Sequence, residues 1–308
     1  MKVLRRLCAS LHVLVCLVAC HAVAEPVQAG PASPAPARPL QVVASFSILA
    51  DITREVAGPV AVVTSLVGAN ADAHVYEPSP ADVMRVARAD LVIVNGLRFE
   101  GWIERLIRAS GQRRSPLVAT RGIVPRRAGG SEDPHAWQDL ALAERYVENI
   151  RQGLVAAAPA HAPALNRRAG AYRQRLRDLD RRIRADLARV PAAQRVVITS
   201  HDAFGYFGAA YGVRFLAPQG WSTDQAPSAA AVAGMIRQVR DHGVRALFVE
   251  NISDRRLLAR IAEDSGARIG GRLYSDALSA TDGPAPSYLA LMAHNAGTLL
   301  QGLEGAAR

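Results

Sequence analysis

From residue 40 onward, short apolar stretches alternate with stretches in which apolar residues recur every three or four positions. Apolar stretches rich in β-branched residues predict strands at residues 41–46, 60–67 and 91–95. The periodic stretches between them predict helices at 48–57 and 80–88. Strands that alternate with helices are typical of a parallel sheet with helices on both faces. The pattern therefore predicts an N-terminal α/β lobe over residues 40–160.

A single long amphipathic stretch follows this lobe. Its apolar residues recur at intervals of three or four from Leu165 to Val190, which predicts one helix over residues 161–190. At 1.5 Å per residue such a helix is roughly 40 Å long, about the length of a whole domain. Its other face is rich in arginine, and we expect that face to be solvated rather than to bind an anion.

The alternation of strands and helices resumes beyond Pro191. The pattern predicts strands at 195–200, 246–250 and 267–273 and helices at 228–239, 254–264 and 286–300. These elements predict a second α/β lobe over residues 191–308. No sequence repeat of fixed period relates the two lobes, so they are expected to be similar in pattern only.

The N-terminal residues carry an export signal. Residues 1–24 combine a basic start, an apolar run from Leu11 to Ala19 and small residues, which predicts a signal peptide. The run is too short to span a bilayer. Cleavage is predicted either after Ala24, which gives a soluble protein, or before Cys20, which gives a lipoprotein. Residues 25–39 are rich in Pro and Ala and predict a flexible tether.

The amino-acid composition limits which residues can bind a metal and which partners are expected. The three cysteines, Cys8, Cys16 and Cys20, all lie in or at the end of the signal peptide, so the mature chain has no thiolate and any soft-metal ligand must be a histidine. The formal net charge is +10, but the chain has no compact basic patch interleaved with aromatic residues. We therefore expect no nucleic-acid partner.

Three of the histidines, His74, His135 and His201, lie in loops at predicted strand ends or just before helices. Ligands of open α/β sheets collect at the carboxyl ends of the strands, so these positions suit one shared site. A four-coordinate metal needs one more ligand, and without cysteine it should be a carboxylate. Asp276, just past the last predicted strand, is the preferred candidate and Glu250 is its rival. The other three histidines of the mature chain are expected to be structural: His161, His242 and His294.

These residues lie in motifs that carry a family resemblance. The motifs are H-x-Y-E-P-S-P at His74, D-P-H-x-W at His135, S-H-D-A-F-G-Y-F at His201 and Y-S-D-A-L-S at Asp276. Together they resemble the zinc and manganese solute-binding proteins of ABC importers over nearly the whole mature chain. The resemblance implies two α/β lobes joined by a long rigid helix, with the metal in the cleft between the lobes. It also implies His74 and His135 as ligands from the N-terminal lobe, and His201 and Asp276 from the C-terminal one.

The resemblance further implies a role in uptake rather than catalysis. Many zinc-specific members carry a long histidine-rich loop before the second ligand, but the stretch 121–132 is short and contains no histidine. Members that prefer manganese usually have Glu at the third ligand, where this chain has His201. Three imidazoles and one carboxylate suit Zn²⁺, whereas Mn²⁺ favours more oxygen ligands. We therefore expect Zn²⁺ as cargo, with manganese or iron as the alternative.

Two functions of another class compete with metal delivery. A secreted zinc hydrolase could use the same ligands, but the sequence has no H-E-x-x-H and the fourth ligand closes the site, so we predict that the protein is not an enzyme. Some proteins of the family are described as surface adhesins, and nothing else in the sequence supports that role. The expected setting is a monomer in the periplasm whose partner is an ABC permease in the inner membrane, with a metallochaperone as a further candidate partner.

Two finer expectations concern the metal ligands. Carboxylates close to them in sequence are candidates to orient them: Asp202, Glu77, Asp133 and Asp139. Asp133 and Asp139 could instead cap the helix that follows His135. Because a rigid connecting helix limits lobe closure, we expect metal release to involve local movement of the loop around His135 rather than a wide hinge.

Overall fold

The computed structural model describes residues 38–128, 131–241, 244 and 246–305. The predicted signal peptide, both cleavage sites and residues 25–37 of the predicted tether lie outside the described residues. Pro39–Arg308 forms one compact unit. Within the described part of the chain, no helix is both long enough and apolar enough to cross a bilayer.

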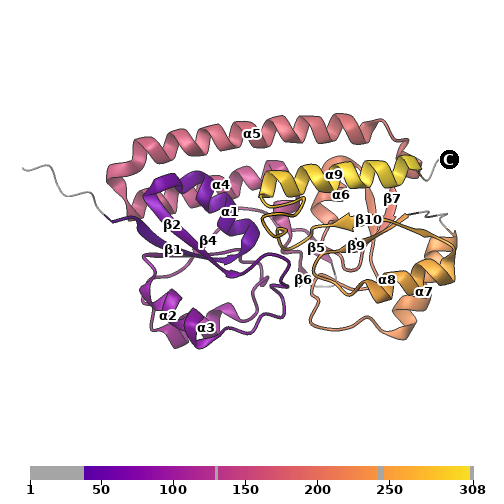
Figure 1. Ribbon diagram of the computed structural model, residues 1–308, viewed down its shortest axis with the longest axis horizontal. Helices are drawn as coiled ribbons and strands as arrows, with labels where there is room; N and C mark the ends of the chain where they lie inside the picture. Colours follow the sequence, from indigo (N-terminus) through magenta and orange to yellow (C-terminus); the bar gives the residue numbers. More distant parts are fainter. Residues whose placement is uncertain (1–37, 129–130, 242–243, 245, 306–308) are drawn as a thin grey trace, which may run out of the picture. The chain divides into compact units, whose positions relative to one another are not determined.

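The N-terminal lobe contains a four-stranded parallel sheet in the order β2-β1-β3-β4: β1 (Leu40–Phe46), β2 (Ala61–Val67), β3 (Leu91–Val94) and β4 (Leu117–Val118). The central strand β1 is buried from Val42 to Phe46, which explains why apolar residues do not alternate there with exposed polar ones. On one side of the sheet lie α1 (Ser47–Ala57) and α4 (Leu140–Ala157), and on the other lie α2 (Pro80–Arg88) and α3 (Ile103–Ser110) (Figure 1).

The C-terminal lobe repeats this arrangement. Its parallel sheet has the order β10-β9-β7-β8: β7 (Val196–Ile198), β8 (Arg214–Leu216), β9 (Ala246–Glu250) and β10 (Arg268–Leu273). If the strands of each lobe are numbered from 1 in chain order, both sheets have the strand order 2-1-3-4. Helices lie on both sides of this sheet (Figure 1): α6 (Gly205–Tyr211) and α9 (Tyr288–Gly305) on one, α7 (Ala229–Asp241) and α8 (Arg255–Ser265) on the other. The lobes thus share a parallel architecture without sharing a sequence repeat.

The long helix α5 (Ala162–Ala188) joins the lobes, as predicted. It packs against α1 and α4 of the N-terminal lobe and against α6 and α9 of the C-terminal lobe (Figure 1). Its periodic apolar residues are buried as expected: Leu165, Ala169, Tyr172, Leu176, Leu179, Ile183 and Leu187. One hydrophobic cluster extends from the first lobe along this helix into the second. The expected fold of two α/β lobes connected by a long helix is confirmed.

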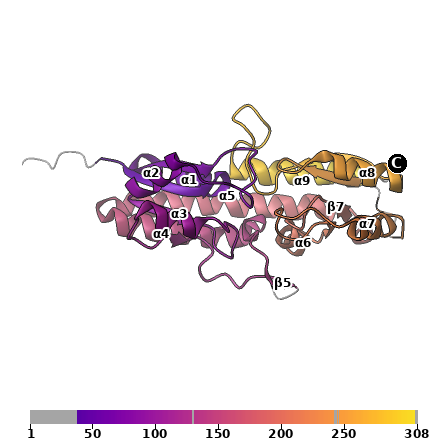
Figure 2. The same ribbon diagram turned by 90° about the horizontal axis from the view of Figure 1, so that it is seen from below.

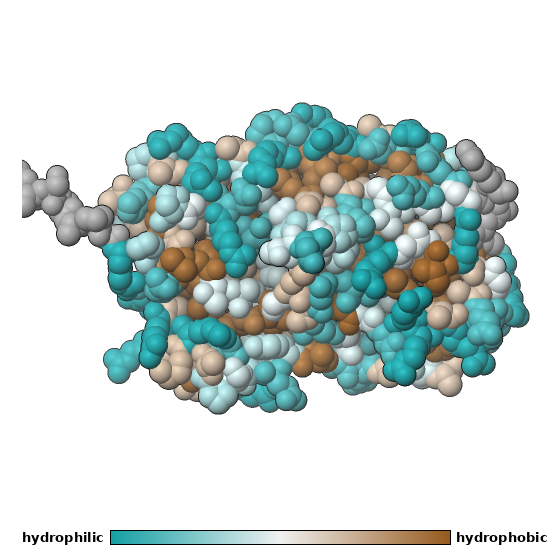
Figure 3. All heavy atoms as spheres, in the orientation of Figure 1, coloured by the Kyte–Doolittle hydropathy of each residue, from teal (hydrophilic) through white to brown (hydrophobic). Residues whose placement is uncertain are grey.

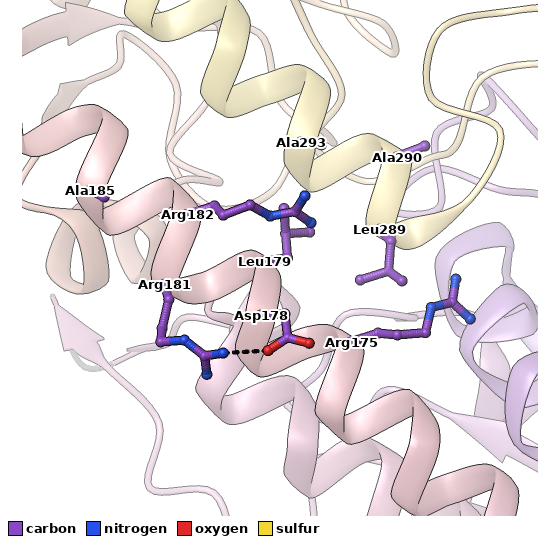
Figure 4. A pocket seen from close by; sticks show the side chains of 9 residues that line it. All are labelled: Arg175, Asp178, Leu179, Arg181, Arg182, Ala185, Leu289, Ala290 and Ala293. Carbon is purple, nitrogen blue, oxygen red and sulfur yellow. Dashed lines mark hydrogen bonds and ion pairs between the residues drawn. The ribbon is translucent and has the colours of Figure 1, made fainter.

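Helix α9 makes a second connection between the lobes. It runs beside α5 (Figure 1), and at its start the backbone N–H of Tyr288 donates to Oδ2 of Asp51 in α1 at 2.8 Å. Between α5 and α9 lies a groove of about 780 Å³, with an apolar floor that shows brown in Figure 3. Figure 4 shows Arg175, Arg181 and Arg182 at its rim, with Arg181 paired to Asp178. Arg175 pairs with Glu55 at 2.9 Å, consistent with a solvated face.

The sequence pattern left several elements without assigned bounds. These are α3, α4, α6, β4, β8 and a small hairpin of β5 (Arg127–Ala128) and β6 (Ser131–Glu132), which projects beyond the helices of the N-terminal lobe (Figure 2). Most of them are short, so few apolar positions are available to set a period. The predicted strand at 60–67 begins one residue later, because Gly58–Val60 forms a 3₁₀ turn.

Candidate metal centre

The four residues singled out in the sequence meet between the lobes. His74 lies in the loop after β2 and His135 directly before the 3₁₀ turn Ala136–Gln138, both in the N-terminal lobe. His201 follows β7 and Asp276 follows β10, both in the C-terminal lobe. Each offers one ligand atom, and these atoms all lie within 4.8 Å of one another. The structure therefore brings all four together, and His74, His201 and Asp276 follow strands of the parallel sheets, as the general rule for α/β sheets predicts.

The carboxylate of Asp276 lies against the three imidazoles. Its Oδ2 is 3.2 Å from Nε2 of His74 and 3.2 Å from Nε2 of His201, and its Oδ1 is 3.6 Å from Nε2 of His135. His135, His201 and Asp276 are fully buried, and the side chain of His74 is 4% exposed. Access from solvent is therefore on the side of His74.

The polar atoms that face the centre have no hydrogen-bond partner in the described part of the chain. They are Nε2 of all three histidines and both carboxylate oxygens of Asp276. They contact one another at 3.2–3.6 Å, but attraction among buried charges does not fully repay the cost of removing those charges from water. A divalent cation would satisfy all of them at once. Tetrahedral zinc with bonds of about 2.0–2.2 Å needs ligand atoms roughly 3.4 Å apart, so the donors need only small inward shifts.

Two further carboxylates orient the buried imidazoles. Oδ1 of Asp133 is 2.8 Å from Nδ1 of His135, and Oε2 of Glu250 is 2.6 Å from Nδ1 of His201. The second oxygen of Glu250 accepts the backbone N–H of His201 at 2.8 Å. A carboxylate on the far nitrogen fixes the ring and leaves the Nε2 lone pair facing the metal. Glu250, weighed from the sequence as a rival ligand, therefore lies behind His201 rather than among the converging donors.

The other candidate orienting residues do not reach the centre. Asp139 caps α4 by accepting the N–H of Ala141, as the capping alternative predicted. Glu77 is exposed, and the half-buried Asp202 makes no side-chain hydrogen bond to a candidate ligand within the described residues. Asp133 is the only one of the four that contacts a candidate ligand in the described structure. Asp133 was a candidate from the sequence because it stands two residues before His135.

The loop that carries Asp276 is fixed from the opposite lobe. The carbonyl of Ser275 accepts Nε1–H of Trp137 at 3.0 Å and Nε2–H of Gln138 at 2.8 Å. The Trp137 indole is fully buried and packs against Phe46 and Phe99, with ring centroids 5.0 and 4.8 Å away. The aromatic core of the N-terminal lobe thus helps to place the carboxylate of the C-terminal lobe.

A pocket of about 590 Å³ leads to the centre from outside. Residues of both lobes line it, including His74, Arg98 and Pro134 from the first and Trp221 from the second. Because His74 is the one candidate ligand that lines this pocket, a metal ion entering here meets His74 first.

The remaining histidines lie elsewhere. His161 precedes α5, and His294 lies within α9, where its Nε2 is 3.1 Å from the carbonyl oxygen of Arg272. Neither is among the converging donors. The expectation for His242 falls on a residue outside the described part of the chain.

The buried charges shift one another's pKa values. Burial alone would lower the pKa of His135, but the carboxylates of Asp276 and Asp133 outweigh it and raise the pKa to about 9. Burial likewise opposes charge on His201, yet Glu250 and Asp276 raise its pKa well above the ordinary value. Burial would raise the pKa of Asp276, but the two imidazoles hold it well below its usual range. Without metal, the charged forms of His135 and His201 are therefore favoured beside an ionised Asp276.

We expect metal binding near pH 7.5 to release at least one proton. His135 is protonated below a pKa of about 9, and only the neutral imidazole can bind a metal. Apparent affinity should therefore fall by about tenfold for each pH unit below 9 per proton released. Titration calorimetry in two buffers of different ionisation enthalpy measures the proton count. A binding enthalpy that is the same in both buffers would contradict this protonation state.

Comparisons with known proteins agree with this architecture. Residues 42–302 match the model of the family described as zinc-uptake complex component A, periplasmic. The iron-binding protein YfeA of Yersinia pestis is 35% identical over 271 residues, covering 86% of this chain and 87% of the relative. The manganese-binding lipoprotein MntA of Bacillus subtilis is 32% identical, covering 86% of this chain and 90% of the relative.

Solved structures of metal-binding proteins also resemble this chain over most of its length. The periplasmic zinc-binding protein TroA of Treponema pallidum superposes with a TM-score of 0.83 at 28% identity, covering 87% of this chain and 99% of TroA. The manganese-bound periplasmic metal-binding protein from Candidatus Liberibacter asiaticus gives a TM-score of 0.78 at 30% identity, covering 85% of this chain and 98% of that protein. The names of these proteins thus refer to different metals: iron, manganese and zinc.

Proposed function

The chain belongs to the family of the periplasmic zinc-uptake complex component A, and from this premise we propose that it captures Zn²⁺ and delivers it to a membrane permease. It is a substrate-binding protein of a metal ABC transporter, and such proteins work with permease and ATPase components. Proteins of this family bind substrates and are not enzymes. We propose the same for this chain, with a divalent metal as cargo rather than as a resident cofactor.

The proposed ligands are His74, His135, His201 and Asp276. The observation that carries the proposal is their convergence: three imidazoles and one carboxylate, which contact one another within 4.8 Å, meet across the lobe boundary. A hydrolase would need an open coordination position and a base beside it. The two nearby carboxylates, Asp133 and Glu250, are instead directed at the far nitrogens of His135 and His201.

Zinc is the proposed cargo because of the donor set. Three imidazoles and one carboxylate suit Zn²⁺, and the carboxylate behind His135 and the one behind His201 raise the basicity of those imidazoles. The second candidate is manganese or iron, which the relatives MntA and YfeA are named for binding. Both carboxylate oxygens of Asp276 face the imidazoles, so Asp276 could supply a further oxygen ligand.

The proposed setting follows from the N-terminal sequence and the relatives. We propose a periplasmic monomer, cleaved after residue 24 or lipidated at Cys20; several relatives are named as lipoproteins. In the proposed division of the mature chain, residues 25–39 are a tether, 40–160 and 191–308 are the lobes and 161–190 is the linking helix. An inner-membrane ABC permease would receive the metal, and a metallochaperone is a further candidate partner.

Elemental analysis with competitive titration tests this proposal. The mature protein, stripped of metal and then exposed to Zn²⁺ and Mn²⁺ in competition, should retain one zinc per chain. The variant His201→Ala should lose or greatly weaken this binding, whereas His294→Ala, at a histidine outside the centre, should keep it. Preference for manganese would overturn the choice of cargo, and the absence of any tight metal would overturn the function.

A further inference from the structure

The two candidate ligands of the N-terminal lobe lie in the same local structure. Asp72 stands two residues before His74, and Asp133 stands two residues before His135. In each case Oδ1 of the aspartate accepts the backbone N–H of the histidine, at 2.9 Å for His74 and 3.0 Å for His135. We call these two segments the Asp-x-His turns.

Each Asp-x-His turn is fixed to its own lobe at the middle residue. Nε1–H of Trp102 donates to the carbonyl of Ala73 at 2.7 Å, and the side-chain amide of Asn95 donates to the carbonyl of Pro134 at 3.0 Å. Both bonds lie within the N-terminal lobe. They therefore do not depend on contact between the lobes.

The aspartate of each turn is bound by a hydroxyl group of the opposite lobe. Oγ1–H of Thr223 donates to Oδ2 of Asp72 at 2.5 Å. The hydroxyl of Tyr206 donates to the backbone carbonyl of Asp133 at 3.1 Å. Tyr206 also accepts the backbone N–H of Arg126 at 3.0 Å, so it bridges the two ends of the segment that contains β5 and β6.

We propose that the hydroxyl groups of Tyr206 and Thr223 act as paired clamps on the Asp-x-His turns and so set the rate at which the bound metal leaves. Both are positioning residues, because they act through Asp133 and Asp72 and do not face the metal. When lobe contact weakens, the bonds of Trp102 and Asn95 stay with the N-terminal lobe and these two hydroxyl bonds are lost. Each loss removes the hydroxyl bond from the opposite lobe to the aspartate that holds a ligand histidine's backbone.

This inference rests on the proposed function and makes it more specific. Helices α5 and α9 connect the lobes and limit how far the lobes can separate. A small separation is nevertheless enough to break hydrogen bonds of 2.5–3.1 Å, and it leaves both cores intact. Release then requires movement of two loops, those of His74 and His135, and not of the His135 loop alone.

Metal release from the full mature chain tests the proposal. Zinc-loaded protein is mixed with an excess of coloured chelator, and release is followed by stopped flow. Tyr206→Phe and Thr223→Val should each release zinc about threefold to tenfold faster, the range that corresponds to losing one net hydrogen bond. Because the two clamps act on different loops, the double variant should show the product of the two effects.

Matched controls separate a clamp from general stabilisation. Tyr211 lies on the same helix as Tyr206, is equally buried at 4% exposure, and donates to Oδ1 of Asp180 in α5 at 3.0 Å. Tyr211→Phe should lower the melting temperature of the metal-free protein about as much as Tyr206→Phe, yet leave the release rate unchanged. Thr223→Ser keeps the hydroxyl and should restore slow release.

The outcomes distinguish a failure of the clamps from a failure of the proposed function. If Tyr206→Phe releases zinc no faster than Tyr211→Phe, or Thr223→Val no faster than Thr223→Ser, the clamps are wrong while one bound zinc per chain still supports the proposed function. If the wild-type chain binds none of zinc, manganese or iron, both are overturned.

Discussion

Replacing Asp276 with asparagine is expected to weaken zinc binding by at least about 100-fold, because even the loss of an outer partner of a ligand costs about 10–100-fold. Asp276 is the only carboxylate among the four converging residues, and both its oxygens face imidazole nitrogens. Asparagine keeps the shape but removes the negative charge. It also removes the main charge that raises the pKa of His135, which reduces competition from protons and offsets part of the loss.

The measurement is competitive titration with a chelator of known zinc affinity. Asp282→Asn is the matched control, because Asp282 lies in the same loop but is exposed to solvent. The control should bind zinc like the wild type. Equal affinity of Asp276→Asn and Asp282→Asn would mean that the carboxylate is not a ligand.

Replacing Trp137 with alanine is expected to lower the free energy of unfolding of the metal-free protein by about 3–5 kcal/mol. The indole is fully buried against Phe46 and Phe99, and its N–H donates to the carbonyl of Ser275. Truncation leaves a large cavity at the lobe boundary and removes one of the two donors to that carbonyl. Urea unfolding of the metal-free variant measures the loss.

Two further variants resolve the origin of this effect. Trp221→Ala removes a partly exposed indole at the mouth of the pocket and should cost roughly 1 kcal/mol or less. Trp137→Phe fills most of the cavity but lacks the N–H donor. It should recover much of the stability while still weakening metal binding, because the Asp276 loop loses one of its two bonds to the N-terminal lobe. A loss for Trp137→Ala no larger than for Trp221→Ala would contradict the packing described here.

The sequence predicted those parts of the fold whose physical cause is local. Strand β1 is recognisable because it is buried on both faces, and α5 because its apolar residues keep a regular period along the whole helix. Helix α2 is marked at its start by the capping box of Ser79 and Asp82. The four converging residues are recognisable because each lies at a strand end or loop and carries metal-binding chemistry.

The remaining features depend on contacts that sequence spacing does not contain. The role of Glu250 follows from the pairing of β7 with β9, which places the end of β9 beside His201. Thr223 and Asp72 are 151 positions apart, and only the packing of the two lobes brings them together. The repeated Asp-x-His spacing was visible in the sequence, but its two hydrogen bonds to the opposite lobe were not.

The most direct test of the central claim is to locate the metal. Crystals of the zinc-loaded mature protein, with diffraction data collected above and below the zinc absorption edge, should show one anomalous peak between the lobes. That peak should lie about 2.0–2.2 Å from Nε2 of His74, His135 and His201 and from a carboxylate oxygen of Asp276. A peak at any other position, or one bonded to Glu250 in place of Asp276, would contradict the account.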